Sequence, residues 1–191
     1  MDDIVACIVG YLLGSVPVAV LVARRHGVDL YATGDGNPGA WNALKQLGGR
    51  RAWPAFIGDA AKGLLAGALG HAAGGIWVAY AAVAAAMLGH AFPLFAGLRG
   101  GKSVMTFAGG VFALAPVAAA LALALCAAVS AARSFAWGAR AGIFAFPPLQ
   151  LVFGPVEHVA ATGALMTLIG ALFLIDRSGR ATRVPGAAPP T

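Results

Sequence analysis

Residues 104–132 read VMTFAGGVFALAPVAAALALALCAAVSAA, a run of 29 positions without a charged side chain. An α-helix needs about 20 apolar residues to cross the hydrocarbon core of a bilayer, so this run is long for one upright span and short for two. Pro116 can divide the run, because proline removes a helical hydrogen-bond donor and clashes with the preceding turn. The run therefore predicts a membrane protein and leaves one or two crossings open.

Other apolar segments surround this run. They lie at about 4–23, 52–70, 75–92, 141–156 and 159–175. Of the 191 residues, 60% are hydrophobic and only 10% are charged, whereas soluble domains carry about 25% charged residues. Because too few charges remain to coat a globule in water, lipid must solvate most of the exterior. We predict an all-α helical membrane bundle that forms a single domain over residues 1–176. The tail, 177–191, is rich in proline and glycine and is expected to lack stable structure.

The distribution of charge decides the number of spans. Two crossings of 104–132 give seven spans, with the N-terminus outside and the C-terminal tail in the cytoplasm. All of the 13 Lys and Arg residues except Lys62 then lie inside. They are Arg24, Arg25, Lys45, Arg50, Arg51, Arg99, Lys102, Arg133, Arg140, Arg177, Arg180 and Arg183. Cytoplasmic loops are enriched in these residues, and a single crossing would place Arg133 and Arg140 outside. Seven spans are therefore predicted, and because orientation explains the net charge of +6, we expect no nucleic-acid partner.

One apolar segment contains two charged residues, Asp59 and Lys62. Three positions apart, they are neighbours on a helix. Ionisable residues inside a membrane usually face a partner or a polar cavity. The pair is either a structural ion pair or a support for a polar site formed by the cytoplasmic loops.

The first cytoplasmic loop, residues 27–45, contains the pattern G-x-G-x-x-G at 34–39. A dinucleotide-binding fingerprint requires a preceding strand, but an apolar helix precedes this loop. The glycines still allow backbone N–H groups to approach a ligand, and a helix that starts near Pro38 would direct its N-terminus at an anion. The candidate binding residues are Gly34, Gly36, Asn37, Gly39, Asn42 and Lys45. The alternative interpretation is an ordinary interfacial turn.

The second cytoplasmic loop, residues 88–104, is close to a P-loop, but Ala96 stands where the first glycine belongs. No strand precedes this loop, which argues against a nucleoside triphosphatase. What remains is Gly-Gly-Lys-Ser at the start of a helix, which would place free N–H groups beside an ammonium group. The loop also contains an arginine, whose guanidinium matches the geometry of phosphate. The candidates are Arg99, Gly100, Gly101, Lys102 and Ser103. Two such loops on one face predict a ligand that carries phosphate.

His90 lies at the end of an apolar segment. It is a candidate general acid or base, or an interfacial hydrogen-bond donor, since no carboxylate lies close to it in sequence. No residue spacing indicates a metal site, and we predict neither a metal nor a cofactor.

Four motifs carry a resemblance to a known family. They are Tyr11-Leu-Leu-Gly-Ser-x-Pro17, the loop from Gly34 to Lys45, Gly58-Asp-x-x-Lys-Gly63, and Leu88-Gly-His-x-Phe-Pro-x-Phe followed by Gly100-Gly-Lys-Ser-Val104. In this order they resemble the bacterial acyl-phosphate:glycerol-3-phosphate acyltransferases (the PlsY family), over roughly residues 8–115.

The resemblance implies an activity. The family moves a fatty acyl group from acyl phosphate to the 1-hydroxyl of glycerol 3-phosphate and releases lysophosphatidic acid, a step of phospholipid synthesis at the cytoplasmic face of the bacterial plasma (inner) membrane. Acyl phosphate, glycerol 3-phosphate and the lipid bilayer are then the expected partners. On this resemblance Lys102 and the Gly100–Ser103 turn bind phosphate, while Asn37, Asn42 and Lys45 place glycerol 3-phosphate. The candidate catalytic residues are Lys102, His90 and Asp35.

The chain departs from the family pattern in both loops and near its end. Asp35, Trp41, Lys45 and Ser103 stand where the family has Ser, Thr, Arg and Gly, and the last signature retains only its arginines. A carboxylate in an anion site repels phosphate unless it is protonated, paired or metal-bound. These departures leave two alternatives to the acyltransferase. One is a catalytically silent relative that binds a phosphate-bearing lipid precursor or a partner enzyme, and the other is a small transporter of an anionic solute.

Overall fold

The computed structural model describes residues 2–181, with side chains as far as residue 175. Every element of this part of the chain is helical, as predicted. The elements are α1 (Asp2–Gly14), α2 (Val18–Arg25), α3 (Ala40–Leu47), α4 (Gly49–Ala91), the 3-10 helix η1 (Leu94–Ala96), α5 (Val104–Leu114), α6 (Pro116–Ala132), α7 (Phe135–Phe153) and α8 (Val156–Ala181).

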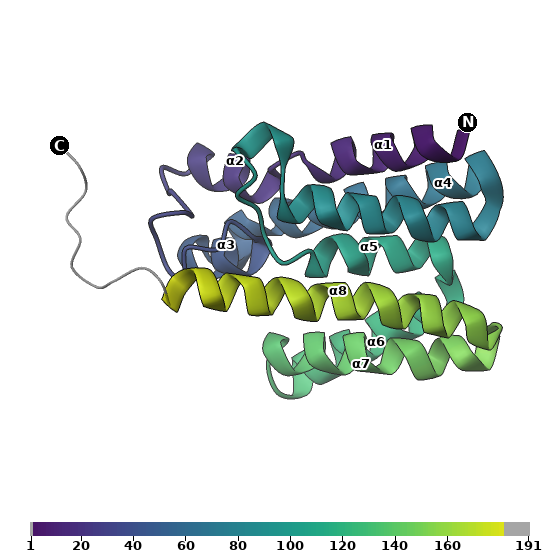
Figure 1. Ribbon diagram of the computed structural model, residues 1–191. Coiled ribbons are helices and arrows are strands. Elements are labelled where there is room, and N and C mark those ends of the chain that lie inside the picture. The colour runs from purple at the N-terminus through teal and green to yellow at the C-terminus, as the bar shows by residue number, and fades with distance from the viewer. Residues whose placement is uncertain (1, 182–191) are drawn as a thin grey trace.

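The long helix α4 is two helices joined by a sharp turn. Gly74 and Gly75 have non-helical backbone angles, and the φ of +79° at Gly75 lies in the region that favours glycine. The two halves therefore run back along each other (Figure 1). Together with α1, α5, α6, α7 and α8 they give seven helical passes in the described chain. Pro116 begins α6, one residue after α5 ends, so the predicted division of 104–132 is confirmed.

Some boundaries differ from the expectation. The segment 4–23 is not one continuous helix, because α1 ends at Gly14 and α2 begins at Val18. Pro17 lies in this break, where its missing N–H cannot continue a helix. Helix α7 begins before residue 141 and α8 continues beyond 176 to Ala181, so the first five residues of the expected tail are helical. The rest of that tail lies outside the described residues.

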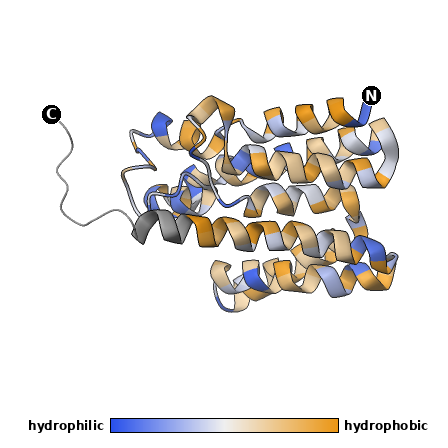
Figure 2. Ribbon diagram, in the orientation of Figure 1, coloured by the Kyte–Doolittle hydropathy of each residue, from blue (hydrophilic) through white to orange (hydrophobic). Residues whose placement is uncertain are grey.

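The apolarity of the helices agrees with a membrane protein. By length and hydropathy, three stretches in the described chain could cross a bilayer, and two shorter apolar helices accompany them. The three are Asp2–Arg25, Gly49–Ala96 and Val156–Ile175, and the shorter two are Val104–Leu114 and Pro116–Ala132. Hydrophobic residues cover the length of the bundle (Figure 2).

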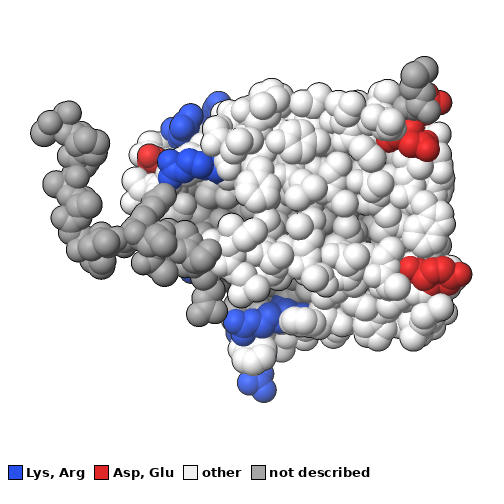
Figure 3. Space-filling model, in the orientation of Figure 1, with Lys and Arg blue, Asp and Glu red and all other residues white. Residues whose placement is uncertain are grey.

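The charged side chains gather at the two ends of the bundle. On the face shown in Figure 3, Lys and Arg side chains lie at the end that holds α2 and α3, and most of the Asp and Glu side chains lie at the opposite end. The loops predicted to be cytoplasmic therefore share one end, which is the basic one.

Close contacts between helices hold α4 in place. A Cβ atom added to Gly89 would clash with the Tyr11 carbonyl oxygen of α1, and one added to Gly109 of α5 would clash with the Ala60 carbonyl oxygen. Small residues at such contacts let backbones approach closely, which is how membrane helices associate without a hydrophobic driving force. Helices α1 and α5 thereby fix both halves of α4, which carry the polar residues described next.

Candidate active site

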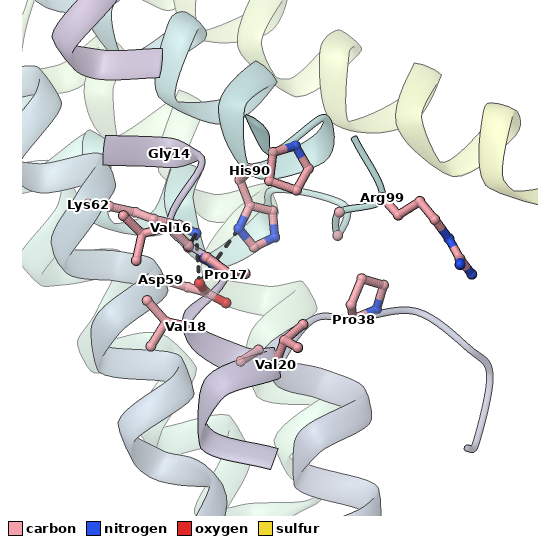
Figure 4. Close-up of a pocket in the computed structure, with 14 residues that line it drawn as sticks. Gly14, Val16, Pro17, Val18, Val20, Pro38, Asp59, Lys62, His90 and Arg99 are labelled. Atoms are coloured by element: carbon pink, nitrogen blue, oxygen red, sulfur yellow. Dashed lines mark hydrogen bonds and ion pairs between the residues drawn. The ribbon is translucent and has the colours of Figure 1, made fainter. Parts of the chain in front are cut away.

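A buried charged cluster joins the two halves of α4. The Lys62 Nζ atom lies 2.9 Å from Asp59 Oδ1 and donates a hydrogen bond to the Val16 carbonyl oxygen at 3.0 Å. The His90 Nδ1 atom lies 3.6 Å from the same Asp59 oxygen. Figure 4 shows these three side chains converging beside the break between α1 and α2. No carboxylate lies close to His90 in the sequence, and the fold provides one 31 positions earlier in the chain.

This cluster lines a pocket at the basic end of the bundle. The pocket walls come from the α1–α2 break and α2, from both halves of α4, and from both cytoplasmic loops (Figure 4). The lining residues are Gly14, Val16, Pro17, Val18, Ala19, Val20, Pro38, Asp59, Lys62, His90, Pro93, Arg99, Gly100 and Gly101. Both loops thus contribute residues to one pocket. Asp59 and Lys62 form the structural ion pair that was one interpretation, and they also lie at the polar site that was the other. The pair ties the α1–α2 break to α4, and it also borders the pocket.

Asp59 is incompletely satisfied. Its side chain is 1% exposed, and within the described residues its Oδ2 atom has no hydrogen-bond partner. Burying a carboxylate oxygen without a partner is costly. Such a group at the wall of a pocket is a feature of functional sites more than of structural ion pairs.

Asn42 has a structural position in the first loop. It is buried, and its amide nitrogen donates to the carbonyl oxygens of Leu30 at 3.2 Å and Thr33 at 2.9 Å. Its amide oxygen lies 3.4 Å from the Gln46 side-chain nitrogen, which donates to it. The expectation that Asn42 helps to place a substrate is therefore not supported by its contacts, since it holds the loop against α3.

The other candidates of the first loop do not line the pocket. The Asp35 carboxylate accepts a hydrogen bond from the Asn37 backbone N–H at 3.2 Å. Gly34 and Gly36 both have positive φ and form the bend of the loop, and Gly39 precedes α3 as its N-cap. Only Pro38 from this loop lines the pocket.

Lys45 lies on α3 above an aromatic ring. Its Nζ atom is 5.5 Å from the ring centroid of Trp41, which stacks on Phe135 of α7 at 5.6 Å. Trp41, one of the departures from the family pattern, thus connects α3 to the α6–α7 part of the bundle. The cation is exposed and close enough to the loops to contribute to their positive potential.

The two glycines of the second loop do not provide free N–H groups. The Gly100 N–H donates to the Ala91 carbonyl oxygen at 3.0 Å, and the Gly101 N–H donates to the His90 carbonyl oxygen at 3.1 Å. The prediction that these groups remain free for phosphate was wrong, because the loop folds back onto the end of α4. A Cβ atom at Gly101 would clash with the His90 imidazole, so a side chain at this position would have to displace the ring or the loop.

Ser103 and Lys102 connect the second loop to neighbouring helices. The buried Ser103 hydroxyl donates to the Met87 carbonyl oxygen at 2.6 Å, and its backbone has a left-handed φ of +59°. The Lys102 Nζ atom lies 4.6 Å from the Phe173 ring centroid on α8. Lys102 therefore lies between the pocket-lining glycines and α8, where the N-terminus of α5 begins.

Sequence reasoning missed Tyr31, which joins the two loops. The Tyr31 hydroxyl donates to the Arg99 carbonyl oxygen at 3.0 Å, and the Arg99 guanidinium lies 4.8 Å from the centre of the tyrosine ring. Burial raises the pKa of Tyr31 above its usual value, although the nearby Arg99 charge acts in the opposite direction. A tyrosine in a glycine-rich loop has no signature that identifies such a contact in advance.

The pocket combines two chemical capacities. Arg99 and Lys62 supply positive charge, and the imidazole of His90 can accept or donate a proton. Among the described side chains, no group of three His, Cys, Asp or Glu residues is arranged to hold a metal ion. The arrangement suits an anionic ligand and an acid–base step.

The sequence is similar to one family of known proteins. The sequence model of the glycerol-3-phosphate acyltransferase family matches residues 4–183. A glycerol-3-phosphate acyltransferase of Roseobacter denitrificans is 36% identical over 93% of this chain and 88% of its own length. Those of Rubrobacter xylanophilus and Geobacter sulfurreducens are 44% and 40% identical over 61% and 65% of this chain, and the matches span 59% and 65% of the two relatives.

A solved structure resembles the whole bundle. It is the crystal structure of PlsY, an integral membrane glycerol 3-phosphate acyltransferase, in its glycerol 3-phosphate form. The superposition has a TM-score of 0.79 at 29% sequence identity and covers 96% of this chain and 92% of the other. The all-helical membrane architecture predicted from the sequence is thereby confirmed.

Proposed function

The chain belongs to the glycerol-3-phosphate acyltransferase family, and we propose that it transfers a fatty acyl group from acyl phosphate to the 1-hydroxyl of glycerol 3-phosphate. The products are lysophosphatidic acid and phosphate. The observation that carries this proposal is the convergence of both glycine-rich loops on one cationic pocket at the basic end of a membrane bundle. The relatives' names give acyl transfer to glycerol 3-phosphate, the resemblance of the motifs adds acyl phosphate as the donor, and the pocket offers a place for the reaction.

The position of the pocket supports a cytoplasmic active site in a bacterial plasma membrane. Lys and Arg residues concentrate in cytoplasmic loops of membrane proteins, and the pocket lies at the end where these residues gather. This orientation places the N-terminus outside and α8 with its end inside. The acyl chain of the donor then lies among the apolar helices or in the surrounding lipid, while its phosphate faces the loops.

We assign the binding of the two phosphate groups to the cations around the pocket. Arg99 lines it directly, and Lys102 follows the lining residue Gly101. The N-terminus of α5 adds N–H groups without helical partners beside Lys102. Lys45 and the bend at 34–39 border the same end of the bundle and are assigned to glycerol 3-phosphate. A lysine at position 45 can supply charge, although it lacks the two-pronged grip of an arginine.

The chemistry needs little covalent help from the protein. The oxygen of the 1-hydroxyl attacks the carbonyl carbon of acyl phosphate, the carbon–oxygen bond to phosphate breaks, and phosphate leaves with the electron pair. Because an acyl phosphate is already activated, holding the two substrates together and stabilising the developing charge supply much of the rate. Cations that hold both phosphates serve both purposes.

The assay uses the purified protein in vesicles with labelled glycerol 3-phosphate and palmitoyl phosphate. We expect labelled lysophosphatidic acid from the wild type and a loss of about 100-fold or more in Lys102→Ala, because a charge that stabilises the transition state is removed. Arg140→Ala is the matched control, since Arg140 lies over Trp137 on α7, away from the pocket, and it should retain the wild-type rate.

Other outcomes identify the alternatives. A folded protein that is stabilised by either substrate but forms no product would contradict the enzyme and favour the silent relative. Movement of labelled glycerol 3-phosphate into vesicles without acyl phosphate would favour the transporter. The similarities to known acyltransferases favour neither alternative.

A further inference from the structure

A second pocket lies at the basic end of the bundle and shares no lining residue with the candidate active site. It is a groove of about 470 Å³ between the end of α2, the turn from α3 to α4 and the first turns of α4. We call it the basic groove, and its lining residues are His26, Leu47, Gly48, Gly49, Arg50, Arg51 and Pro54. The acyltransferase reaction gives it no role.

The basic groove carries positive charge that no neighbouring carboxylate compensates. Arg50 and Arg51 are both exposed in its wall. Helix α2 ends in Arg24 and Arg25, directly before the lining residue His26. Among the described residues that line the groove none is acidic, and neither Arg50 nor Arg51 forms an ion pair with another described residue. Because a guanidinium presents N–H groups in a geometry that matches phosphate, the groove suits a ligand with a phosphate group.

The face of α4 that begins in the groove continues onto the apolar surface of the bundle. Trp53, Ile57 and Leu64 follow Arg50 at helical spacing and are 59%, 60% and 41% exposed. In a membrane protein such side chains face lipid chains, and tryptophan is enriched where the chains meet the headgroups. An α-helix rises about 1.5 Å per residue, so Arg50 lies about 4 to 5 Å beyond Trp53 along the axis, towards the headgroups. The groove arginines are thus at the depth of lipid phosphate.

The charge and the apolar face point to one ligand. We propose that the basic groove binds the headgroup of an anionic phospholipid in the adjoining leaflet, whose chains lie along Trp53, Ile57 and Leu64. A soluble phosphate would contact the arginines alone, whereas a phospholipid contacts both the arginines and the apolar face. A zwitterionic headgroup adds a cation to its phosphate, and the arginines repel this cation. Lys and Arg residues clustered just outside a span favour anionic lipid for the same reason.

The orientation of the protein in the bilayer does not account for this arrangement. The enrichment of Lys and Arg in cytoplasmic loops requires cations at this end of the bundle, and separate exposed arginines satisfy that requirement. Arg133 and Arg140 are exposed arginines of this kind and lie outside the groove. Orientation does not require two cations to line one groove beside a lipid-facing tryptophan. The two pairs of arginines therefore provide a matched comparison.

The test measures how brominated phospholipids quench the fluorescence of Trp53. The full-length protein is placed in vesicles of phosphatidylcholine that contain a small fraction of a brominated lipid, either phosphatidylglycerol or phosphatidylcholine. The two brominated lipids have the same chains, brominated near the headgroup, and differ only in the headgroup. The Trp53 signal is the difference between each protein and the same protein with Trp53→Phe. We expect the anionic lipid to be favoured at Trp53 by about fivefold or more, since each arginine near the surface contributes about that factor.

Two double variants show whether the groove causes this preference. Arg50→Gln with Arg51→Gln removes the charge and retains polar side chains, so the preference should fall below about twofold. Arg133→Gln with Arg140→Gln removes the same charge outside the groove, and the preference at Trp53 should be retained. All four positions are exposed, and substitutions at such positions seldom change stability much. Added salt should reduce the wild-type preference, because exposed charges are screened.

Four results would overturn the inference. The first is equal quenching of Trp53 by the two lipids in the wild type, which decides the matter whether or not the variants fold. The second is an unchanged preference without Arg50 and Arg51. The third is an equal loss of preference without Arg133 and Arg140, which would indicate a general effect of net charge.

The fourth result concerns a soluble ligand. Inorganic phosphate that abolishes the preference, when chloride at the same ionic strength does not, would assign the groove to free phosphate instead of lipid. Because every readout is lipid binding at Trp53, no substrate of the acyltransferase is needed. A wild-type protein that forms no lysophosphatidic acid would therefore overturn the proposed function and leave this inference intact.

Discussion

Two buried polar clusters lie in the bundle and differ in how their atoms are satisfied. The charged cluster consists of Asp59, Lys62 and His90. The neutral cluster joins Tyr80 of α4, Gln150 of α7 and Thr162 of α8. In the neutral cluster, Gln150 donates to the Tyr80 oxygen at 2.8 Å and accepts from the Thr162 hydroxyl at 2.7 Å. The Tyr80 hydroxyl also reaches the His158 carbonyl oxygen at 3.0 Å.

The difference separates a structural from a functional use of polarity in a membrane. The neutral cluster is a chain of hydrogen bonds that runs from Thr162 through Gln150 and Tyr80 to the His158 carbonyl oxygen, and such bonds tie membrane helices together. The charged cluster leaves one Asp59 oxygen without a partner in the described chain and opens to a pocket. We conclude that the neutral cluster serves the packing of α7 and α8 on α4, and that the charged one is retained for the site.

The largest expected effect comes from breaking the charged cluster. Lys62→Met removes the cation beside Asp59 and leaves a buried carboxylate with only the His90 imidazole beside it. Removing one partner of a buried ion pair costs about 3 to 5 kcal/mol, so thermal unfolding of the purified protein should occur at a clearly lower temperature. The loss should be larger than that of any single substitution in the neutral cluster.

A double variant is the control for this effect. Lys62→Met combined with Asp59→Asn replaces the pair by two uncharged groups, which is often much less harmful than leaving one charge alone. The double variant should therefore unfold at a higher temperature than Lys62→Met. If the double variant is the less stable of the two, the buried charge is not the cause.

A substitution in the neutral cluster should lower the stability of the protein and leave its kcat unchanged. Gln150→Leu removes both hydrogen bonds that Gln150 makes and leaves the Tyr80 and Thr162 hydroxyls with fewer partners. Hydrogen bonds between membrane helices contribute about 1 to 2 kcal/mol at most, so a smaller decrease in the unfolding temperature is expected. The kcat of the folded protein should remain within about twofold of the wild type, because no member of the cluster lines the pocket. A large loss of kcat without unfolding would remove the distinction between the two clusters.

The sequence predicts the helices well, because apolarity and charge act locally. A segment that must face lipid has to be apolar along its length, so the segments between residues 4 and 175 could be read directly. The positions of the basic residues between the segments predicted two helices in 104–132, and Pro116 predicted where the first ends and the second begins. The break at Pro17 was predictable in principle, since proline interrupts helices, but the length of the run concealed it.

The site could be predicted only in part, because its key contacts join distant residues. The turn at Gly74–Gly75 brings His90 back to Asp59, and no local pattern gives that distance. The same turn lets the second loop use the N–H groups of its glycines on the end of α4, which the resemblance to a phosphate-binding loop did not indicate. The neutral cluster was missed because each member is a single polar residue in an apolar segment.

A smaller effect is expected where the two loops meet. Tyr31→Phe removes the hydrogen bond to the Arg99 carbonyl oxygen and retains the ring beneath the guanidinium, which should lower stability by about 1 kcal/mol. Because burial raises the pKa of Tyr31 above its ordinary value of 10.0, the folded state favours the neutral phenol. Its contribution is therefore complete below that pH and declines as the pH rises above it.

The measurement is the unfolding temperature of both proteins near pH 8 and above pH 10. The wild type should lose stability between these conditions by more than Tyr31→Phe does. An equal change in the two proteins would mean that other groups cause the alkaline loss and that Tyr31 does not couple the loops.

The smallest effect tests whether Asp35 weakens the electrostatics of the pocket entrance. Its carboxylate accepts from the Asn37 N–H, and a serine hydroxyl can accept the same bond, so Asp35→Ser should preserve the loop. A charge roughly 10 Å from a phosphate in water contributes about 0.4 kcal/mol per unit charge. The Kd for glycerol 3-phosphate should therefore fall about two- to fourfold, and the gain in affinity should shrink at high ionic strength.

Asp29→Ser is a matched control, because the Asp29 carboxylate accepts the same kind of bond, from the Tyr31 N–H at 2.9 Å. Equal gains in both variants would indicate a general effect of net charge, and unchanged or weaker binding in Asp35→Ser would show that this carboxylate does not repel the substrate.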